Sequence, residues 1–95
     1  MAREKQCECV REVVLTNPLG LHARPATTFV DRASKFQAEV TLWKDGREAN
    51  GKSIMDLLAL GAERGSRLTV RTRGVDAGKA LRALLALLQQ EKEEA

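Results

Sequence analysis

The sequence contains little cysteine and no long hydrophobic run. Its two cysteines, Cys7 and Cys9, have no second cysteine pair and no histidine nearby, which excludes a four-ligand zinc set and a disulfide framework. We expect both thiols to be reduced, as is usual in the cytosol. No stretch approaches the roughly 20 apolar residues of a membrane helix. The segment from Met1 to Arg11 is charged and lacks the apolar stretch of a signal peptide, so we predict a cytoplasmic protein without membrane insertion.

Aromatic residues are scarce as well, at 3% of the chain. Sheets that bind RNA stack bases on exposed aromatic side chains, and only Phe29, Phe36 and Trp43 are available here. The net charge of +3 is too small and too evenly spread to demand a nucleic-acid partner. We therefore predict no nucleic-acid binding. We interpret four arginines on or near the last predicted strand as a solvated basic face: Arg64, Arg67, Arg71 and Arg73.

What the chain does contain is the composition of an ordinary globular domain, with 43% hydrophobic and 31% charged residues. Its 95 residues suffice for one domain with its own core and leave no room for a second catalytic domain. We predict a single domain over residues 1–95. Within it, residues 1–7 form an N-terminal extension and residues 91–95 a charged tail.

Local patterns divide the first half of the chain into a strand, a helix and a hairpin. Residues 9–16 are rich in Val and Leu and end at an Asn-Pro-Leu-Gly cluster, which predicts a strand and a loop. Pro25 suits the first position of a helix that ends near Lys35. Residues 38–43 alternate between apolar and polar, and an Asp-Gly turn then predicts a hairpin that returns through residues 48–50. The buried face of the helix is predicted to consist of Ala26, Phe29, Val30 and Ala33.

The second half of the chain predicts two helices and one strand. Ser53 followed by Asp56 matches a capping box, and Gly61 closes the short helix that the box opens. Residues 67–73 alternate again, and a final helix capped at or near Asp76 follows. Each strand has one apolar and one polar face. We therefore predict an α+β open-faced sandwich, βαββαβα, with a four-stranded antiparallel sheet and three helices on one face. The final helix carries a leucine stripe: Leu81, Leu84, Leu85 and Leu88.

The one histidine lies where a loop meets a predicted helix start, in the heptapeptide Gly20-Leu21-His22-Ala23-Arg24-Pro25-Ala26. Backbone N–H groups at a helix start lack partners and the helix dipole is positive there, so an anion attached to His22 would be stabilised. Arg24 adds a planar fork of donors that suits phosphate oxygens. A neutral imidazole keeps one ring nitrogen free as a nucleophile near pH 7. The pattern indicates a phosphorylated histidine, whereas a lone histidine without this setting is more often a surface or capping residue.

This heptapeptide resembles the active-site signature of HPr, the histidine-containing phosphocarrier family of the bacterial phosphoenolpyruvate-dependent sugar phosphotransferase system. A second segment, Asn50-Gly51-Lys52-Ser53-Ile54-Met55, is similar to the family's signature around a regulatory serine. The predicted order of strands and helices also matches the family's open-faced fold. The resemblance covers residues 8–90 and leaves residues 1–7 as an extension that typical members lack.

The resemblance implies that His22 accepts a phosphoryl group on Nδ1 from phosphorylated enzyme I and passes it to sugar-specific enzyme II components. Arg24 would steady the phosphoryl group. Such a protein is a phosphorylated intermediate rather than an enzyme, and it needs no cofactor or metal, because transfer between docked proteins depends mostly on positioning and charge stabilisation. Two alternatives lie within the family: a paralogue in the nitrogen-related phosphotransferase chain, and a mainly regulatory HPr-like protein. The presence of His22 favours transfer.

Ser53 has two predicted roles, one structural and one regulatory. As the N-cap of its helix it stabilises the fold by about 1 kcal/mol. The resemblance adds phosphorylation of Ser53 by an HPr kinase/phosphorylase, which hinders transfer at the histidine. A phosphate at a helix start is stabilised by the helix dipole. However, Asp56 stands where many serine-regulated members carry a small residue, so repulsion between like charges opposes the modification.

Four apolar residues are predicted to bind partners: Leu21, beside His22, and Ile54, Met55 and Leu58 of the second predicted helix. Leu57 and Leu60 suffice for the core side of a two-turn helix, which leaves the other apolar residues of the helix partly exposed. Some of them, Ile54 first, could instead pack inside, because the apolar stripe of a helix can be broader than two residues. By the resemblance, this surface and Arg24 meet acidic and apolar surfaces of enzyme I and enzyme II components.

Residues 46–53 also satisfy the nucleotide-binding P-loop pattern Gly-x-x-x-x-Gly-Lys-Ser. A P-loop enzyme needs a parallel sheet and a further strand that ends in a magnesium-binding Asp, and this chain is too short for both. The residues inside the pattern, Arg47, Glu48 and Ala49, fit a hairpin strand better. We predict that the match is coincidental.

Overall fold

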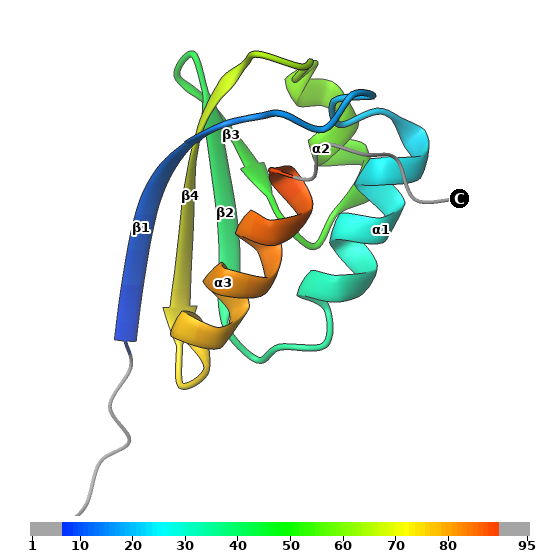
Figure 1. Cartoon of the computed structure of the whole chain (residues 1–95). Helices are drawn as coiled ribbons and strands as arrows, with labels where there is room; N and C mark the ends of the chain where they lie inside the picture. The colour runs from blue at the N-terminus through cyan, green and yellow to red at the C-terminus, as the bar shows by residue number, and fades with distance from the viewer. Residues whose placement is uncertain (1–6, 90–95) are drawn as a thin grey trace, which may run out of the picture.

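The structure, a computed structural model, describes residues 7–89, which form four strands and three helices (Figure 1). The elements follow in the order β1 (Cys7–Val14), α1 (Ala23–Ala33), β2 (Glu39–Lys44), β3 (Arg47–Asn50), α2 (Ile54–Leu60), β4 (Arg67–Gly74) and α3 (Ala77–Leu88). This is the predicted order. Among residues 7–89, no helix has the length and apolar character needed to cross a membrane.

The strands form one antiparallel sheet in the order β1-β4-β2-β3, and all three helices cover the same face of it (Figure 1). The alternation of side chains along β4 explains this layering. Leu68 and Val70 are fully buried beneath the helices, whereas Arg71 is only half-buried and Arg73 is exposed on the other face. A strand with one apolar and one polar face buries only one side, so the predicted open-faced sandwich is confirmed.

The β2–β3 hairpin turns at Asp45 and Gly46, as the Asp-Gly pair predicts. Both residues have positive φ angles, 53° and 80°. Two consecutive positive φ angles define the type I′ turn, whose twist matches that of the strands it joins. The turn sets a register that pairs Leu42 with Ala49, and both side chains are buried.

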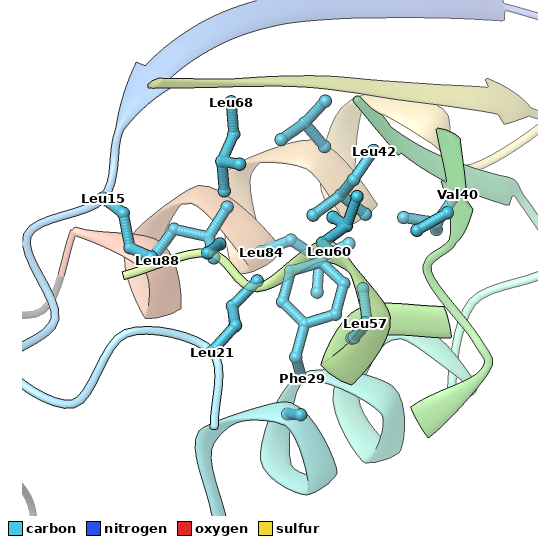
Figure 2. Packing of buried hydrophobic residues seen from close by; sticks show 14 of the residues in the cluster. Leu15, Leu21, Phe29, Val40, Leu42, Leu57, Leu60, Leu68, Leu84 and Leu88 are labelled. Carbon is cyan, nitrogen blue, oxygen red and sulfur yellow. The ribbon is translucent and has the colours of Figure 1, made fainter. Parts of the chain in front are cut away.

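The core lies between the helices and the sheet, and Phe29 of α1 points into it between Leu21 and Leu57 (Figure 2). Of the four residues predicted to form the buried face of α1, Ala26, Phe29 and Ala33 are buried, whereas Val30 is only partly buried and packs against the cluster. Leu84 and Leu88 from the leucine stripe of α3 reach the same cluster, as do Leu42 and Leu68 from the sheet. Burying each such side chain stabilises the fold by about 1.5 to 3 kcal/mol.

The strand β1 spans Cys7–Val14, two residues earlier at both ends than the predicted 9–16. Its partner explains the shift, because β4 spans Arg67–Gly74 and the two strands pair over their full length, from Cys7 with Gly74 to Val14 with Arg67. Cys7, which we predicted to lie in the N-terminal extension, therefore belongs to the sheet. Cys7 and Cys9 are both free thiols. The rest of the predicted extension and the predicted tail at 91–95 lie outside the described residues.

The helix α1 begins at Ala23 rather than at the predicted Pro25. Pro25 is thus the third helical residue, where its missing N–H costs nothing because the first amides of a helix have no partner within the helix. The cap of α3 also differs in detail. Asp76 is the N-cap residue, but its side chain makes no capping bond. Its two carboxylate oxygens instead accept the backbone N–H groups of Gln37 and Ala38, each at 2.9 Å.

These two bonds make Asp76 a source of pH-dependent stability. The hydrogen bond from Gln37 lowers the pKa of the Asp76 carboxyl, and the bond from Ala38 and the charge of Lys52 act in the same direction. A carboxylate whose pKa is lower in the folded state stabilises the fold above its unfolded pKa of about 3.9 and loses that contribution as the pH falls through the folded pKa. We expect Asp76→Asn to be less stable than the wild type at pH 7 and closer to it in acid.

Urea unfolding measured from pH 7 down to acid tests this expectation. Asp31→Asn, on the exposed face of α1, removes the same charge without touching these bonds and separates the loss of charge from the loss of hydrogen bonds. An Asp76→Asn variant that stays below the wild type by the same margin at every pH would contradict the assignment.

Candidate functional site

His22 is the N-cap residue of α1, one position before the first helical residue. Its backbone is extended, with φ −86° and ψ −167°, and its carbonyl oxygen accepts the N–H of Ala26 at 2.8 Å. The side chain makes no capping hydrogen bond and is exposed. The backbone of His22 is therefore committed to the helix, while its imidazole is free to meet another molecule.

Two free backbone N–H groups and a guanidinium group lie at the start of α1. Within residues 7–89, the backbone N–H groups of Ala23 and Arg24 have no hydrogen-bond partner, and Pro25 has no N–H to offer. The Arg24 side chain is exposed and forms no ion pair in this part of the chain. Free amides at the positive end of a helix dipole and a guanidinium together favour an anion attached at this point. The roles predicted for His22 and Arg24 require an anion at this point.

The loop before His22 is fastened to the segment that follows α2. The N–H of Leu21 donates to the carbonyl oxygen of Ala62 at 3.0 Å. Gly20 has a φ of +64°, and a methyl group on it would lie 2.7 Å from the Ala62 oxygen and 2.8 Å from Cα of Glu63. Only glycine fits both the left-handed conformation and this close approach. The loop is thus held at a fixed place relative to α2.

The prediction that Leu21 binds a partner is wrong, because its side chain is only 4% exposed. It points into the core beside Phe29 (Figure 2). A buried leucine next to an exposed histidine anchors the loop in the core and leaves partner contacts to other residues.

Ser53 is the N-cap of α2, as predicted. Its hydroxyl oxygen accepts the N–H of Asp56 at 3.2 Å, which is one half of the predicted capping box. The other half is not formed, because the Asp56 carboxylate accepts the N–H of Asn50 at 2.9 Å instead of that of Ser53. The N–H of Ser53 has another partner, the carbonyl oxygen of Asn50 at 3.0 Å. A phosphate on Ser53 would therefore lie close to the Asp56 carboxylate, which already accepts the N–H of Asn50.

The apolar residues of α2 divide as the sequence predicts. Leu57 and Leu60 are buried, whereas Ile54, Met55 and Leu58 are 37%, 75% and 40% exposed. Ile54, the residue most expected to pack inside, is the least exposed of the three but still reaches the surface. We call Ile54, Met55 and Leu58 the α2 patch. Because α1 packs against α2 and Leu21 bonds to Ala62, the start of α1, which His22 caps, and the helix α2 lie at the same end of the molecule (Figure 1).

Sequence reasoning missed one exposed apolar residue at this end. Leu19 is 42% exposed and lies three residues before His22 in the same loop. The only signal that could have found it was its position between Pro18 and Gly20, since a leucine inside a turn-forming cluster has no helix or strand face on which to be buried.

The segment that matches the P-loop pattern is not a phosphate-binding loop. Residues 47–50 form the antiparallel strand β3, and Gly51 N–H donates to the carbonyl oxygen of Val40 at 2.7 Å. The ammonium group of Lys52 donates to the carbonyl oxygen of Phe36 at 2.8 Å. The lysine that a P-loop would direct at phosphate holds a neighbouring loop instead, and the prediction of a coincidental match is confirmed.

The uncovered face of the sheet carries paired charges. Arg71 lies over the Trp43 ring, 5.0 Å from its centre, and approaches Glu8 at 3.7 Å. Arg67 approaches Glu12 at 3.4 Å. These contacts engage Arg67 and Arg71 of β4 with their own sheet, as in a solvated face of mixed charge.

Three comparisons with known proteins agree with this geometry. The sequence model of the family described as "PTS HPr component phosphorylation site" matches residues 9–90. The chain is 41% identical over 81 residues to "HPr-like protein Crh" of Halalkalibacterium halodurans, covering 85% of this chain and 96% of that one. It is 43% identical over 83 residues to "Phosphocarrier protein HPr" of Xylella fastidiosa, covering 87% and 93%. The crystal structure of a phosphocarrier protein HPr from Bacillus anthracis superposes with a TM-score of 0.84 at 41% identity, covering 86% of this chain and 98% of that one.

Proposed function

The chain belongs to the HPr family, and on that premise we propose that it is a cytoplasmic phosphocarrier whose phosphoryl group is held on His22. It receives the group from phosphorylated enzyme I and passes it to sugar-specific enzyme II components. The observation that carries the proposal is an exposed histidine at the N-cap of α1, inside the segment that the family model matches. The protein is a phosphorylated intermediate in this scheme rather than an enzyme.

The local geometry supports phosphoryl transfer at the imidazole. Nδ1 of His22 attacks phosphorus as the bond between phosphorus and its group on enzyme I breaks, and that leaving group keeps the bonding electrons. The N–H groups of Ala23 and Arg24 and the Arg24 guanidinium are available to the phosphoryl oxygens. Such transfer depends on positioning and charge stabilisation, which a helix start and one arginine supply.

The α2 patch is the proposed docking surface for both partners. Ile54, Met55 and Leu58 expose apolar area beside the His22 loop, and apolar area at the centre of an interface stabilises a complex. Arg24, on the same side, offers a positive group to an acidic partner. A single docking surface serves donor and acceptor in turn, because both must present their reacting group to the same imidazole.

Ser53 is the proposed site of regulation by an HPr kinase/phosphorylase. A phosphate there would place about two negative charges beside the α2 patch and oppose docking of an acidic partner. Two electrostatic effects oppose each other in forming this phosphate: the start of α2 favours the charge, and the Asp56 carboxylate repels it. The backbone N–H of Asp56 donates to the Ser53 hydroxyl oxygen at 3.2 Å, which keeps the two residues together.

A mainly regulatory HPr-like protein is the second candidate function, favoured by the similarity to the relatives named HPr-like protein Crh. A protein that only regulates has less need of a transferable phosphoryl group. The exposed His22 with free amides beside it therefore supports the carrier over the regulator.

The intact mass of the protein after incubation with enzyme I, magnesium and phosphoenolpyruvate tests the proposal. We expect the mass of one phosphoryl group to be added and then lost in acid, as for a phosphohistidine. Incubation with an HPr kinase and ATP is expected to add an acid-stable phosphate at Ser53, and its absence would contradict the regulatory role. No acid-labile phosphate, with an enzyme I that is active on another carrier, would leave the regulatory candidate as the better account.

A further inference from the structure

Asn17 organises the loop that leads to His22. Its side-chain oxygen Oδ1 accepts the N–H of Leu19 at 3.0 Å, and its carbonyl oxygen accepts the N–H of Gly20 at 3.0 Å. Its own N–H donates at 3.3 Å to the carbonyl oxygen of Leu88, the last residue of α3. One residue thus connects the end of α3 to the two residues that precede Leu21.

The rest of this loop has few other restraints. Pro18 has no N–H, and Leu19 is exposed, so Oδ1 of Asn17 is the acceptor that fixes the first half of the turn. The second half is fixed at Leu21, by its bond to Ala62 and by its burial. Without the Asn17 side chain, residues 17–20 would keep only their backbone hydrogen bonds, to Leu88 and between Gly20 and Asn17.

We propose that Asn17 is a positioning residue for phosphoryl transfer at His22. This inference rests on the proposed function. Asn17 acts through the loop: its side chain sets the turn at Leu19 and Gly20, and this turn sets the path by which Leu21 and His22 enter α1. Phosphoryl transfer requires the attacking nitrogen in line with the breaking bond, and a displacement of about 1 Å can cost about 100-fold in rate.

The α2 patch is expected to contribute to the affinity for enzyme I, and the turn at Asn17 to the rate of phosphoryl transfer. The α2 patch lies on another element, so the affinity for enzyme I is expected to survive a change at Asn17. We expect Asn17→Ala to lower kcat for phosphorylation by enzyme I by about 10- to 100-fold, with KM changed by less than about twofold. Asn17→Ser, whose hydroxyl can accept the same N–H, is expected to recover part of kcat.

The control is Asn50→Ala. The Oδ1 of Asn50 accepts the N–H of Lys52 at 2.9 Å, the same kind of bond across two residues, in a turn that does not lead to His22. We expect this variant to keep the wild-type kcat. Hydrogen exchange of the Leu19 amide, followed by NMR, reports the Asn17 bond without any partner protein, and we expect faster exchange in Asn17→Ala than in the wild type and Asn17→Ser.

Wild-type kcat in Asn17→Ala, with the wild type phosphorylated normally, would overturn this inference alone. Unchanged exchange of the Leu19 amide would overturn it as well, because the bond would then not restrain the loop. An absence of phosphate on the wild type and on every variant would overturn the proposed function and this inference with it. A thermal unfolding curve for each variant shows whether it is folded, and Asn17→Ser keeps the test open if Asn17→Ala is not.

Discussion

A His22→Ala variant is expected to acquire no acid-labile phosphate from enzyme I and phosphoenolpyruvate, while its fold and stability remain close to those of the wild type. The chain has one histidine, so no second imidazole can replace it. The side chain is exposed and makes no capping bond, and its removal is expected to change the free energy of unfolding by no more than about 0.5 kcal/mol. The variant is therefore expected to lose the phosphate-accepting group while it keeps the fold.

The measurement is intact mass, with urea unfolding as the test of folding. Phosphorylation of Ser53 by an HPr kinase is the matched control, because Ser53 lies at the start of α2 and the hydrogen bond of its hydroxyl is to Asp56 of that helix. The variant should accept this second phosphate as the wild type does. An acid-labile phosphate on His22→Ala would show that a residue other than His22 carries the phosphoryl group.

Local patterns were enough to predict all seven elements of the fold. The spacing of Ala26, Phe29 and Ala33 and the Asp-Gly pair at the β2–β3 turn are decided within a few residues, so a single sequence contains the information. The single uncovered face of the sheet follows in the same way, because the alternation along β4 leaves Arg71 and Arg73 on the side away from the helices. Periodicity and turn chemistry are short-range properties.

Features that depend on distant partners were predicted less well. The ends of β1 are set by its pairing with β4, some 60 residues later in the chain. Asp56 and Asp76 both occupy positions typical of helix capping, yet their carboxylates bind amides of other segments, those of Asn50 and of Gln37 and Ala38. Which amide lies within reach of a carboxylate is decided by the tertiary fold.

The same distinction applies to the candidate site. His22, Arg24 and Ser53 are found from motifs, since their chemistry is tied to their sequence neighbours. Leu19 lies inside the turn-forming cluster, which favours exposure, but no local pattern predicts that Leu21 of the same loop is buried. The bond from Leu21 to Ala62 decides it, and this bond brings the loop to a segment more than 40 residues away.

Gly20→Ala is expected to lower the free energy of unfolding by about 2 to 4 kcal/mol and the rate of phosphoryl transfer by about 10- to 100-fold. Two penalties add at this position. A φ of +64° is strained for any residue with a Cβ, and that Cβ would lie 2.7 Å from the backbone oxygen of Ala62. A protein of this size is stable by about 5 to 15 kcal/mol, so the variant should still fold.

Gly61→Ala separates the two penalties. Gly61 has a φ of +65°, almost the same as Gly20, but a methyl group there meets no atom within 4 Å. It should therefore lose only the conformational part, about 1 to 2 kcal/mol, and urea unfolding should show the larger loss for Gly20→Ala. Equal losses would mean that the backbone at Ala62 yields to the new methyl group without cost. A larger loss at Gly20, together with slower transfer, would show that the Leu21–Ala62 bond holds the fold together and places His22 at the same time, because both depend on how closely these two segments approach.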